Sequence, residues 1–215
     1  MSLSMQDWTE PMLEIRNLTH TYPNGTCALN EVNLDIPAGM FGLLGPNGAG
    51  KSSLMRCLAT LQVPTSGRIR FNELDVLAQP EALRATLGYL PQDFGVYPRV
   101  SAEDLLDHLA VLKGISSRGE RRDTVQALLR QVNLWDVRKK AVAGYSGGMR
   151  QRFGIAQALI GNPRLIIVDE PTAGLSTAET QLVVEVVRRL DPEITILLIE
   201  HDLDVAFELA NRVMV

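Results

Sequence analysis

The sequence lacks any apolar run long enough to cross a membrane. Its longest apolar stretches are residues 194–199, around one Thr, and residues 165–168. Both fall far short of the roughly 20 residues that a bilayer requires. Residues 1–11 carry Asp7 and Glu10 and have neither a basic start nor an apolar core, so they do not resemble a secretory signal. We therefore expect a cytosolic chain that does not enter the membrane by itself.

The sequence is also poor in cysteine and has no excess of basic charge. Cys27 and Cys57 do not have the spacing of metal ligands, and Cys57 falls at helical intervals from leucines, which favours a buried, reduced thiol. The net charge is −4, and the short basic clusters at residues 118–122 and 139–140 are typical of solvated helix ends. Because phosphate-backbone binding depends on clustered Lys and Arg, we expect no direct nucleic-acid partner.

The apolar residues that are present form two kinds of strand pattern. Residues 13–15, 32–36 and 69–71 alternate apolar with polar side chains, which is typical of half-buried antiparallel strands. Short and almost wholly apolar runs, which suit strands buried on both faces of a parallel sheet, lie at residues 40–44, 87–90, 165–168 and 194–199. Helical patterns separate these runs, as the crossovers of a parallel sheet require. The sequence therefore predicts an α/β fold.

The helical patterns indicate how the chain is divided. Three of them cover residues 50–61, 148–160 and 177–190. A longer insert at about residues 93–145 holds two amphipathic stripes, and Ser101 with Asp104 resembles a capping box at the start of the first. We expect one domain over residues 1–215, with a mainly parallel core sheet, an N-terminal antiparallel β subdomain and an inserted helical subdomain.

A glycine-rich segment after residues 40–44 fits the pattern G-x-x-x-x-G-K-[ST]. Glycine lets the backbone wrap closely around phosphate oxygens, and the N-terminus of the next helix points unpaired N–H groups at them. We expect Lys51 to neutralise phosphate charge, Ser52 to bind Mg²⁺ and Ser53 to add a phosphate contact. The predicted nucleotide-binding residues of this loop are Gly45, Pro46, Asn47, Gly48, Ala49, Gly50, Lys51, Ser52 and Ser53. This pattern is that of a P-loop and predicts a P-loop fold. By itself it does not distinguish kinases, GTPases and other ATPases.

Polar side chains follow three more of the apolar runs. Asp169 is placed to hold Mg²⁺ through water, and Glu170 to orient and polarise an attacking water. Gln92 and His201 each come after another run. Open α/β sheets bind ligands beyond the carboxyl ends of their strands. We therefore expect these four residues and Lys51 to converge on one phosphate group.

Residues 145–151 read Tyr-Ser-Gly-Gly-Met-Arg-Gln and resemble the signature motif of the ATP-binding cassette (ABC) family, usually Leu-Ser-Gly-Gly-Gln. In that family, the signature of one subunit closes over the γ-phosphate held by the P-loop of its partner, in a head-to-tail dimer with two ATP molecules. The resemblance implies that Ser146, Gly147 and Gly148 contact the partner's ATP. Tyr145 and Met149 depart from the commoner residues, but the Ser-Gly-Gly core remains.

Other family elements follow in order over nearly the whole chain. Tyr22 resembles the A-loop aromatic that stacks on adenine. Gln92 resembles the Q-loop glutamine, which meets the metal and the attacking water and follows the movement of the membrane partner. His201 resembles the switch histidine that contacts the γ-phosphate. At the D-loop position, Ser176 stands where an Asp is common, which puts the dimer contacts of that loop in question.

The resemblance implies an ATPase that uses ATP and Mg²⁺ to drive transport. The expected partners are a second copy of the chain or a paralogous ABC subunit, and a transmembrane permease subunit that holds the chain at the inner face of the cell membrane. Two other interpretations stay open: a soluble ABC ATPase that acts on ribosomes or DNA, and a module that senses nucleotide without turnover.

The transported substrate and the direction of transport also stay open. Residues 90–97 and the signature resemble exporters of the drug and polysaccharide type, whereas residues 200–206 resemble importers of branched-chain amino acids. The chain ends at Val215, where family members usually continue, and this fits either a truncated chain or a short member of the family.

Overall fold

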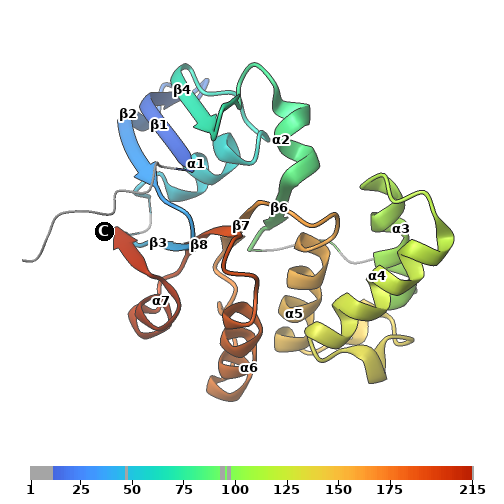
Figure 1. Ribbon diagram of the computed structural model, residues 1–215. Helices are drawn as coiled ribbons and strands as arrows, with labels where there is room; N and C mark the ends of the chain where they lie inside the picture. Colours follow the sequence, from blue (N-terminus) through green and yellow to red (C-terminus); the bar gives the residue numbers. More distant parts are fainter. Residues whose placement is uncertain (1–11, 47, 93–94, 96–97, 215) are drawn as a thin grey trace, which may run out of the picture.

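The computed structural model describes residues 12–46, 48–92, 95 and 98–214 of the 215-residue chain. The described residues form two sheets with helices between and around them (Figure 1). One sheet is antiparallel and comes from the N-terminal part of the chain, while the other is wholly parallel. The predicted α/β fold class is confirmed.

The antiparallel sheet has the strand order β2-β1-β4-β5. Alternation along β1 decides which face is buried, because Leu13 and Ile15 are fully buried and pair with Phe71 and Ile69 of β4. This apolar face lies over α1 (Figure 1). The strands are β1 (Leu13–Thr21), β2 (Cys27–Ile36), β4 (Ser66–Phe71) and β5 (Leu74–Asp75).

The parallel sheet has the strand order β6-β7-β8-β3-β9. Because all its strands run in one direction, their carboxyl ends meet at a single edge. Short β9 pairs with β3, and no pattern in the sequence predicts it. The strands are β3 (Met40–Leu43), β6 (Leu87–Leu90), β7 (Leu165–Asp169), β8 (Thr195–Ile199) and β9 (Arg212–Met214).

Both faces of the parallel sheet are buried, as its apolar runs predict. Leu165 and Ile167 belong to the core that α1 and the antiparallel sheet share, whereas Ile166 and Val168 belong to the core around α5 and α6. Helix α1 therefore lies between the two sheets, and α5, α6 and α7 lie on the far side (Figure 1). These helices are α1 (Lys51–Leu58), α5 (Gly147–Ala158), α6 (Thr177–Arg188) and α7 (Leu203–Leu209).

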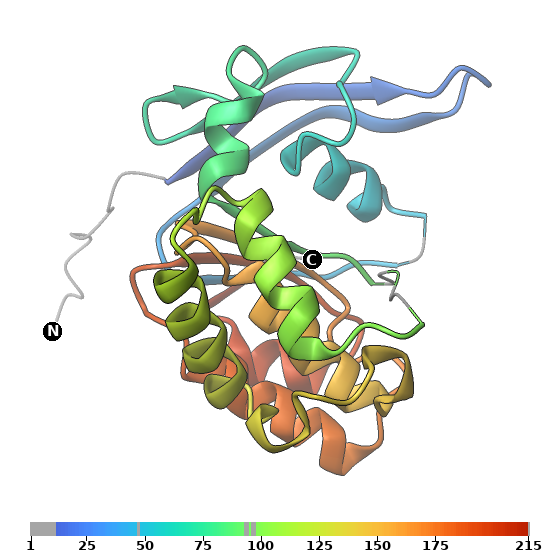
Figure 2. The same cartoon turned by 90° about the vertical axis from the view of Figure 1, so that its right-hand side faces the viewer.

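The chain between β6 and β7 adds helices to one side of the molecule. Figure 2 shows α3 (Ala102–Leu112) and α4 (Arg118–Gln131) side by side, and both pack against α5. The side chains of Ser101 and Ser117 cap them. The remaining helices are α2 (Pro80–Thr86), before β6, and the short 3₁₀ turns Trp135–Val137 and Val142–Gly144. Within the described ranges, no helix is long and apolar enough to span a membrane.

Candidate functional site

The glycine-rich loop joins the end of β3 to the start of α1. Gly45, Gly48 and Gly50 have φ angles of 152°, 85° and 91°, in the region that favours glycine. A side chain at Gly50 would also overlap the carbonyl oxygen of Ala28 on β2. Gly50 is the N-cap of α1 and supplies no side-chain hydrogen bond, so the backbone N–H groups of the first turn are free of a capping side chain.

The ammonium of Lys51 turns back over this loop. Its Nζ donates to the carbonyl oxygens of Gly45 at 2.5 Å and Pro46 at 2.9 Å. Ser52 is exposed at the start of α1, and Gly48 and Ala49 are exposed within the loop. These contacts hold the positive charge of Lys51 at the mouth of the loop, where the expected phosphates would lie. Asn47, another predicted nucleotide contact, lies outside the described residues.

Three predicted catalytic residues meet at the carboxyl edge of the parallel sheet. Nε2 of Gln92 donates to Oε2 of Glu170 at 2.7 Å, and Nε2 of His201 contacts Oε1 of Glu170. Each residue follows a different strand, and these strands, β6, β7 and β8, are neighbours in the sheet. The Glu170 side chain is 15% exposed and that of His201 is 41% exposed, so the cluster opens to solvent on the histidine side.

The backbone of Glu170 is in an unusual conformation. Its φ angle is 48°, a left-handed value that few residues with a side chain adopt, and its N–H donates to the carbonyl oxygen of Ile199 at 2.9 Å. The chain turns sharply after β7 and remains bonded to the end of β8. This turn places the Glu170 carboxylate between Gln92 and His201.

Asp169 ends β7 next to this cluster. Burial raises the pKa of Asp169, and the negative charge of Glu170 raises it further, while the positive charges of Arg56 and Lys51 act in the opposite direction. The charges of Lys51 and Glu170 therefore both act on the ionisation of Asp169. A cation beside Asp169 would offset the cost of its buried charge.

The predicted signature residues lie at the N-terminus of α5, apart from the cluster of Gln92, Glu170 and His201. The Ser146 side chain caps the helix by accepting from the N–H of Met149 at 3.3 Å. A side chain at Gly147 would lie 2.9 Å from Leu175, and one at Gly148 would lie 2.8 Å from Glu179. Glycine is therefore needed here for close packing against the segment that leads into α6.

Tyr145, which departs from the usual residue of the signature motif, packs in the hydrophobic core. Tyr145 is 3% exposed, packs edge-on against Phe153 and donates from its hydroxyl to the carbonyl oxygen of Val137 at 3.0 Å. The larger side chain at this position thus fills the core beneath the motif and ties it to the preceding turn. Ser146 and the two glycines keep their place at the N-terminus of α5.

Comparison with known proteins identifies the family of this chain. The family described as "ABC transporter" matches residues 29–173, about two thirds of the chain. This chain belongs to the ABC transporter ATP-binding family.

Related ABC proteins cover most of the chain. It is 37% identical to the daunorubicin/doxorubicin resistance ATP-binding protein DrrA of Streptomyces peucetius, with 94% of this chain and 62% of DrrA aligned. It is 36% identical to the methionine import ATP-binding protein MetN of Corynebacterium glutamicum, over 94% of this chain and 59% of MetN. It is 35% identical to the phosphonates import ATP-binding protein PhnC of Bdellovibrio bacteriovorus, over 96% of this chain and 85% of PhnC. The chain thus spans about three fifths of the length of DrrA and MetN.

Solved ABC cassettes have the same fold. The dimeric cassette MJ0796 bound to ADP and Pi, in a post-hydrolysis state, superposes with a TM-score of 0.82 at 27% identity, covering 92% of this chain and 91% of that one. A second dimeric structure of MJ0796, described as a bacterial ABC transporter cassette, gives the same values. This ABC domain is therefore similar to cassettes that have been seen as dimers.

Tyr22, predicted to be the adenine-stacking residue of the ABC domain, lies beside the start of α1. The hydroxyls of Tyr22 and Ser53 are hydrogen-bonded at 2.9 Å, and this bond is the main reason why the pKa of Tyr22 is lowered. His20 lies edge-on to the Tyr22 ring, with ring centres 4.7 Å apart. Ser53 is 7% exposed and its hydroxyl is engaged by Tyr22, while the phosphate contact expected of Ser53 stays a prediction.

The residues predicted to bind Mg²⁺ in this ABC domain are Ser52, Gln92 and Asp169, and all offer oxygen. Mg²⁺ is usually held by one or two carboxylates together with phosphate and water. Among the described residues there is no cluster of three or more His, Cys, Asp or Glu side chains placed to hold a metal. The donor set therefore fits Mg²⁺ better than zinc, which takes His and Cys ligands.

Two acids that motif analysis does not assign are also close to the ABC motifs. Glu179 accepts from the Ser146 hydroxyl at 2.9 Å and the Gly148 N–H at 3.2 Å, and it forms a capping box with Ser176 on α6. Its S-x-x-E spacing gave a sequence signal for the capping box, but not for the bond to the signature. Glu200, directly before His201, is 3% exposed, and the resemblance of residues 200–206 to importers gives it no role.

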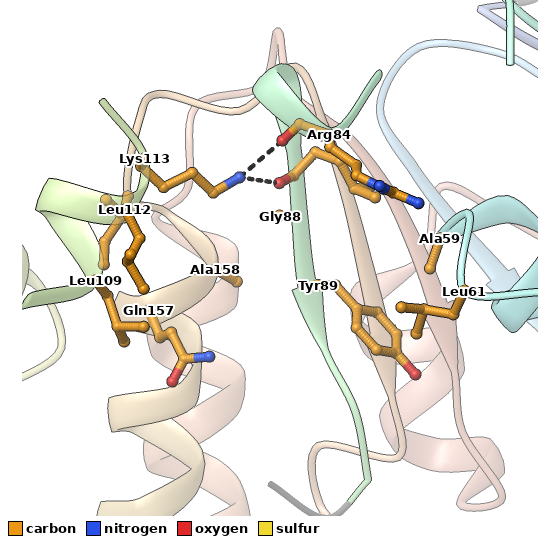
Figure 3. Close-up of a pocket in the computed structure, with 12 residues that line it drawn as sticks. Ala59, Leu61, Arg84, Gly88, Tyr89, Leu109, Leu112, Lys113, Gln157 and Ala158 are labelled. Carbon is orange, nitrogen blue, oxygen red and sulfur yellow. Dashed lines mark hydrogen bonds between the residues drawn. The ribbon is translucent and has the colours of Figure 1, made fainter. Parts of the chain in front are cut away.

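An apolar groove lies beside β6 of the ABC domain (Figure 3). It has a volume of about 300 Å³, and Leu61 and Leu112 on its walls are 63% and 69% exposed. Lys113 closes one end by donating to the carbonyl oxygens of Arg84 at 2.9 Å and Leu87 at 2.8 Å. Tyr89 on the opposite wall belongs to β6, the strand that leads to Gln92.

Proposed function

We propose that this chain binds ATP with Mg²⁺, hydrolyses it, and works as the motor of a transporter. The observation that carries this proposal is the Glu170 carboxylate, held between Gln92 and His201 at the edge where the P-loop strand also ends. A carboxylate in this position can orient a water towards a phosphate that the P-loop holds. A nucleotide sensor without turnover needs no such cluster.

The residues of the chain divide the work of hydrolysis. The N–H groups at the start of α1 bind the phosphates, and Lys51 moves from the carbonyl oxygens of its own loop to the β- and γ-phosphate oxygens. Glu170 polarises the water whose oxygen bonds to the γ-phosphorus as the bond to the bridging oxygen breaks, which yields ADP and phosphate. His201 contacts the γ-phosphate and keeps Glu170 in place. Mg²⁺, held by Ser52 and Asp169 with Gln92 nearby, would neutralise charge on the phosphates.

A second chain completes each site in this proposal. Ser146, Gly147 and Gly148 begin a helix whose N-terminus favours an anion, and they would meet the γ-phosphate on the partner's P-loop. The dimeric state of the related cassette MJ0796 supports a dimer, which we propose is head-to-tail. The partner would be a second copy of the chain or a paralogous ABC subunit.

A permease subunit in the membrane is the third component. The groove between Tyr89 and Leu112 offers an apolar seat for a short helix of that subunit, and β6 runs from this seat to Gln92. The names of the relatives cover drug resistance, methionine import and phosphonate import, so cargo recognition falls to the permease. The chain would then lie on the inner face of the membrane without entering it.

Phosphate release by the purified chain tests the enzymatic part of the proposal. We expect release from ATP that requires Mg²⁺ and stops when EDTA removes the metal. A photoreactive residue at position 112, with position 193 as an exposed control, tests the transporter part in native membranes. A crosslink from position 112 to a membrane protein supports the permease, whereas a crosslink to a ribosomal protein favours a soluble ABC ATPase.

A further inference from the structure

Glu200 is a buried acid that the proposed hydrolysis does not use. It follows the wholly buried strand β8, directly before His201, and is 3% exposed. Burying a carboxylate is costly unless donors surround it, so a small or apolar residue would end this strand more cheaply. The contacts of Glu200 therefore require an explanation.

The Glu200 carboxylate accepts hydrogen bonds from two turns at the edge of the sheet. Oε1 accepts from the N–H of Thr172 at 3.1 Å and from its hydroxyl at 2.7 Å. Oε2 accepts from the N–H of His201 at 3.3 Å. Burial raises the pKa of Glu200, and the donors on Thr172 and His201 counter that rise.

These two turns carry the groups that act on the phosphate. Thr172 comes two residues after Glu170, and His201 comes directly after Glu200. The His201 ring is 41% exposed, so packing does little to fix it. Its position depends on its contact with Glu170 and on its own backbone, which Glu200 holds. A shift between the two turns would separate His201 from Glu170.

We propose that Glu200 is a positioning residue for ATP hydrolysis, which joins the turn after Glu170 to the turn that carries His201. This inference rests on the proposed function, because it gives Glu200 a role only if Glu170 and His201 act on ATP. The link extends towards the signature, since the N–H of Leu175 donates to the carbonyl oxygen of Thr172 at 3.2 Å and Leu175 packs beside Gly147.

The experiment compares Glu200→Gln with two changes at its partner, Thr172→Val and Thr172→Ser. In Glu200→Gln the new amide N–H₂ faces backbone donors, which loosens the link without a large change in volume. Thr172→Val removes the hydroxyl donor and keeps the shape, whereas Thr172→Ser retains the donor. For each purified chain, kcat and KM for ATP, the affinity for ATP and the thermal unfolding midpoint are measured.

We expect Glu200→Gln to lower kcat by about 10- to 100-fold, the scale of a small misplacement of catalytic groups. The affinity for ATP should stay within about twofold, because the P-loop is untouched. Thr172→Val should lose several-fold in kcat, Thr172→Ser should recover it, and the double variant should be no slower than Glu200→Gln, because both changes break one link.

Unchanged kcat in Glu200→Gln, or equal losses in kcat and ATP affinity, would overturn the positioning role while leaving the proposed function intact. If Glu200→Gln fails to fold, the Thr172→Val and Thr172→Ser pair decides the question alone. Failure of the wild-type chain to hydrolyse ATP is a different result, and it would overturn the proposed function and with it the role of Glu200.

Discussion

The side-chain amide of Gln92 donates to Oε2 of Glu170 at 2.7 Å, although 78 positions separate the two residues in the chain. The contact exists because β6 and β7 are neighbours and end at the same edge. Gln92 also follows the strand that lines the apolar groove. A movement at the groove would therefore reach the carboxylate proposed to activate water.

Gln92→Ala removes this contact and should slow hydrolysis more than it weakens ATP binding. A hydrogen bond to a charged group contributes about 1.5–3 kcal/mol, so we expect kcat to fall by about 10-fold or more. Steady-state phosphate release at saturating ATP measures the change, with Gln131→Ala, a change at an exposed residue at the end of α4, as a control. A normal kcat in Gln92→Ala would remove Gln92 from the catalytic cluster.

Lys51→Ala should act on nucleotide binding itself. The change removes the positive charge that lies at the mouth of the P-loop, so we expect the affinity for ATP to fall by more than about tenfold. Equilibrium binding of a fluorescent ATP analogue measures this, and Lys140→Ala controls for the loss of an exposed charge. Equal affinity in the two variants would contradict the P-loop assignment.

Tyr22 offers a test of adenine stacking that separates the ring from the hydroxyl. Stacking of a base on an aromatic ring contributes about 1–3 kcal/mol, so Tyr22→Ala should weaken ATP binding by about 5- to 150-fold. Tyr22→Phe keeps the ring and loses only the Ser53 bond, so its affinity should stay within a few-fold of wild type. If both variants bind alike, the Tyr22 ring does not stack on the base.

The contacts of Glu179 with the signature residues should make the free energy of unfolding depend on pH in the acid range. Bonds from the Ser146 hydroxyl, the Gly148 N–H and Ser176 lower the pKa of Glu179 from 4.5 to about 2. The folded pKa is depressed, so this stabilisation is present above pH 4.5 and is lost as the pH falls towards 2. Glu179→Gln should therefore be less stable than wild type at pH 7, by a margin that shrinks below pH 4.5.

Urea unfolding at pH 7 and pH 3.5 measures that margin. Glu193→Gln serves as the control, because Glu193 is exposed and its carboxylate has no hydrogen bond or ion pair among the described residues. A margin for Glu179→Gln that does not change with pH would show that the carboxylate charge contributes nothing to the fold.

Local patterns predicted most of the sheet and its long helices. The buried runs at residues 87–90 and 165–168 became β6 and β7 because a strand covered on both faces must be apolar throughout. The predicted helices at residues 50–61 and 148–160 are shorter in the structure, ending at Leu58 and Ala158. Strand β9 could not be predicted, since its three residues, Arg212–Met214, are ordered by pairing with β3.

The residues of the candidate site also fall into two groups: those that local motifs predict and those whose roles depend on distant parts of the chain. Lys51, Asp169 and the signature glycines are marked by contiguous motifs, because the backbone shape that binds phosphate needs particular residues in series. The roles of Glu179 and Glu200 depend on partners more than 25 residues away, such as Ser146 and Thr172, and only the fold brings these together. The sequence likewise gives no sign of the hydrogen bond between the hydroxyls of Ser53 and Tyr22, which are 31 positions apart.

The central claim is that Glu170 activates water in an ATP site closed by a second chain. Glu170→Gln keeps the shape of the side chain and removes its charge, so ATP still binds while hydrolysis falls by about 10²- to 10⁴-fold. The decisive measurement is light scattering of Glu170→Gln with ATP and Mg²⁺, alongside phosphate release. We predict an ATP-dependent dimer that accumulates without turnover, whereas a Glu170→Gln chain that hydrolyses ATP at the wild-type rate would contradict the account.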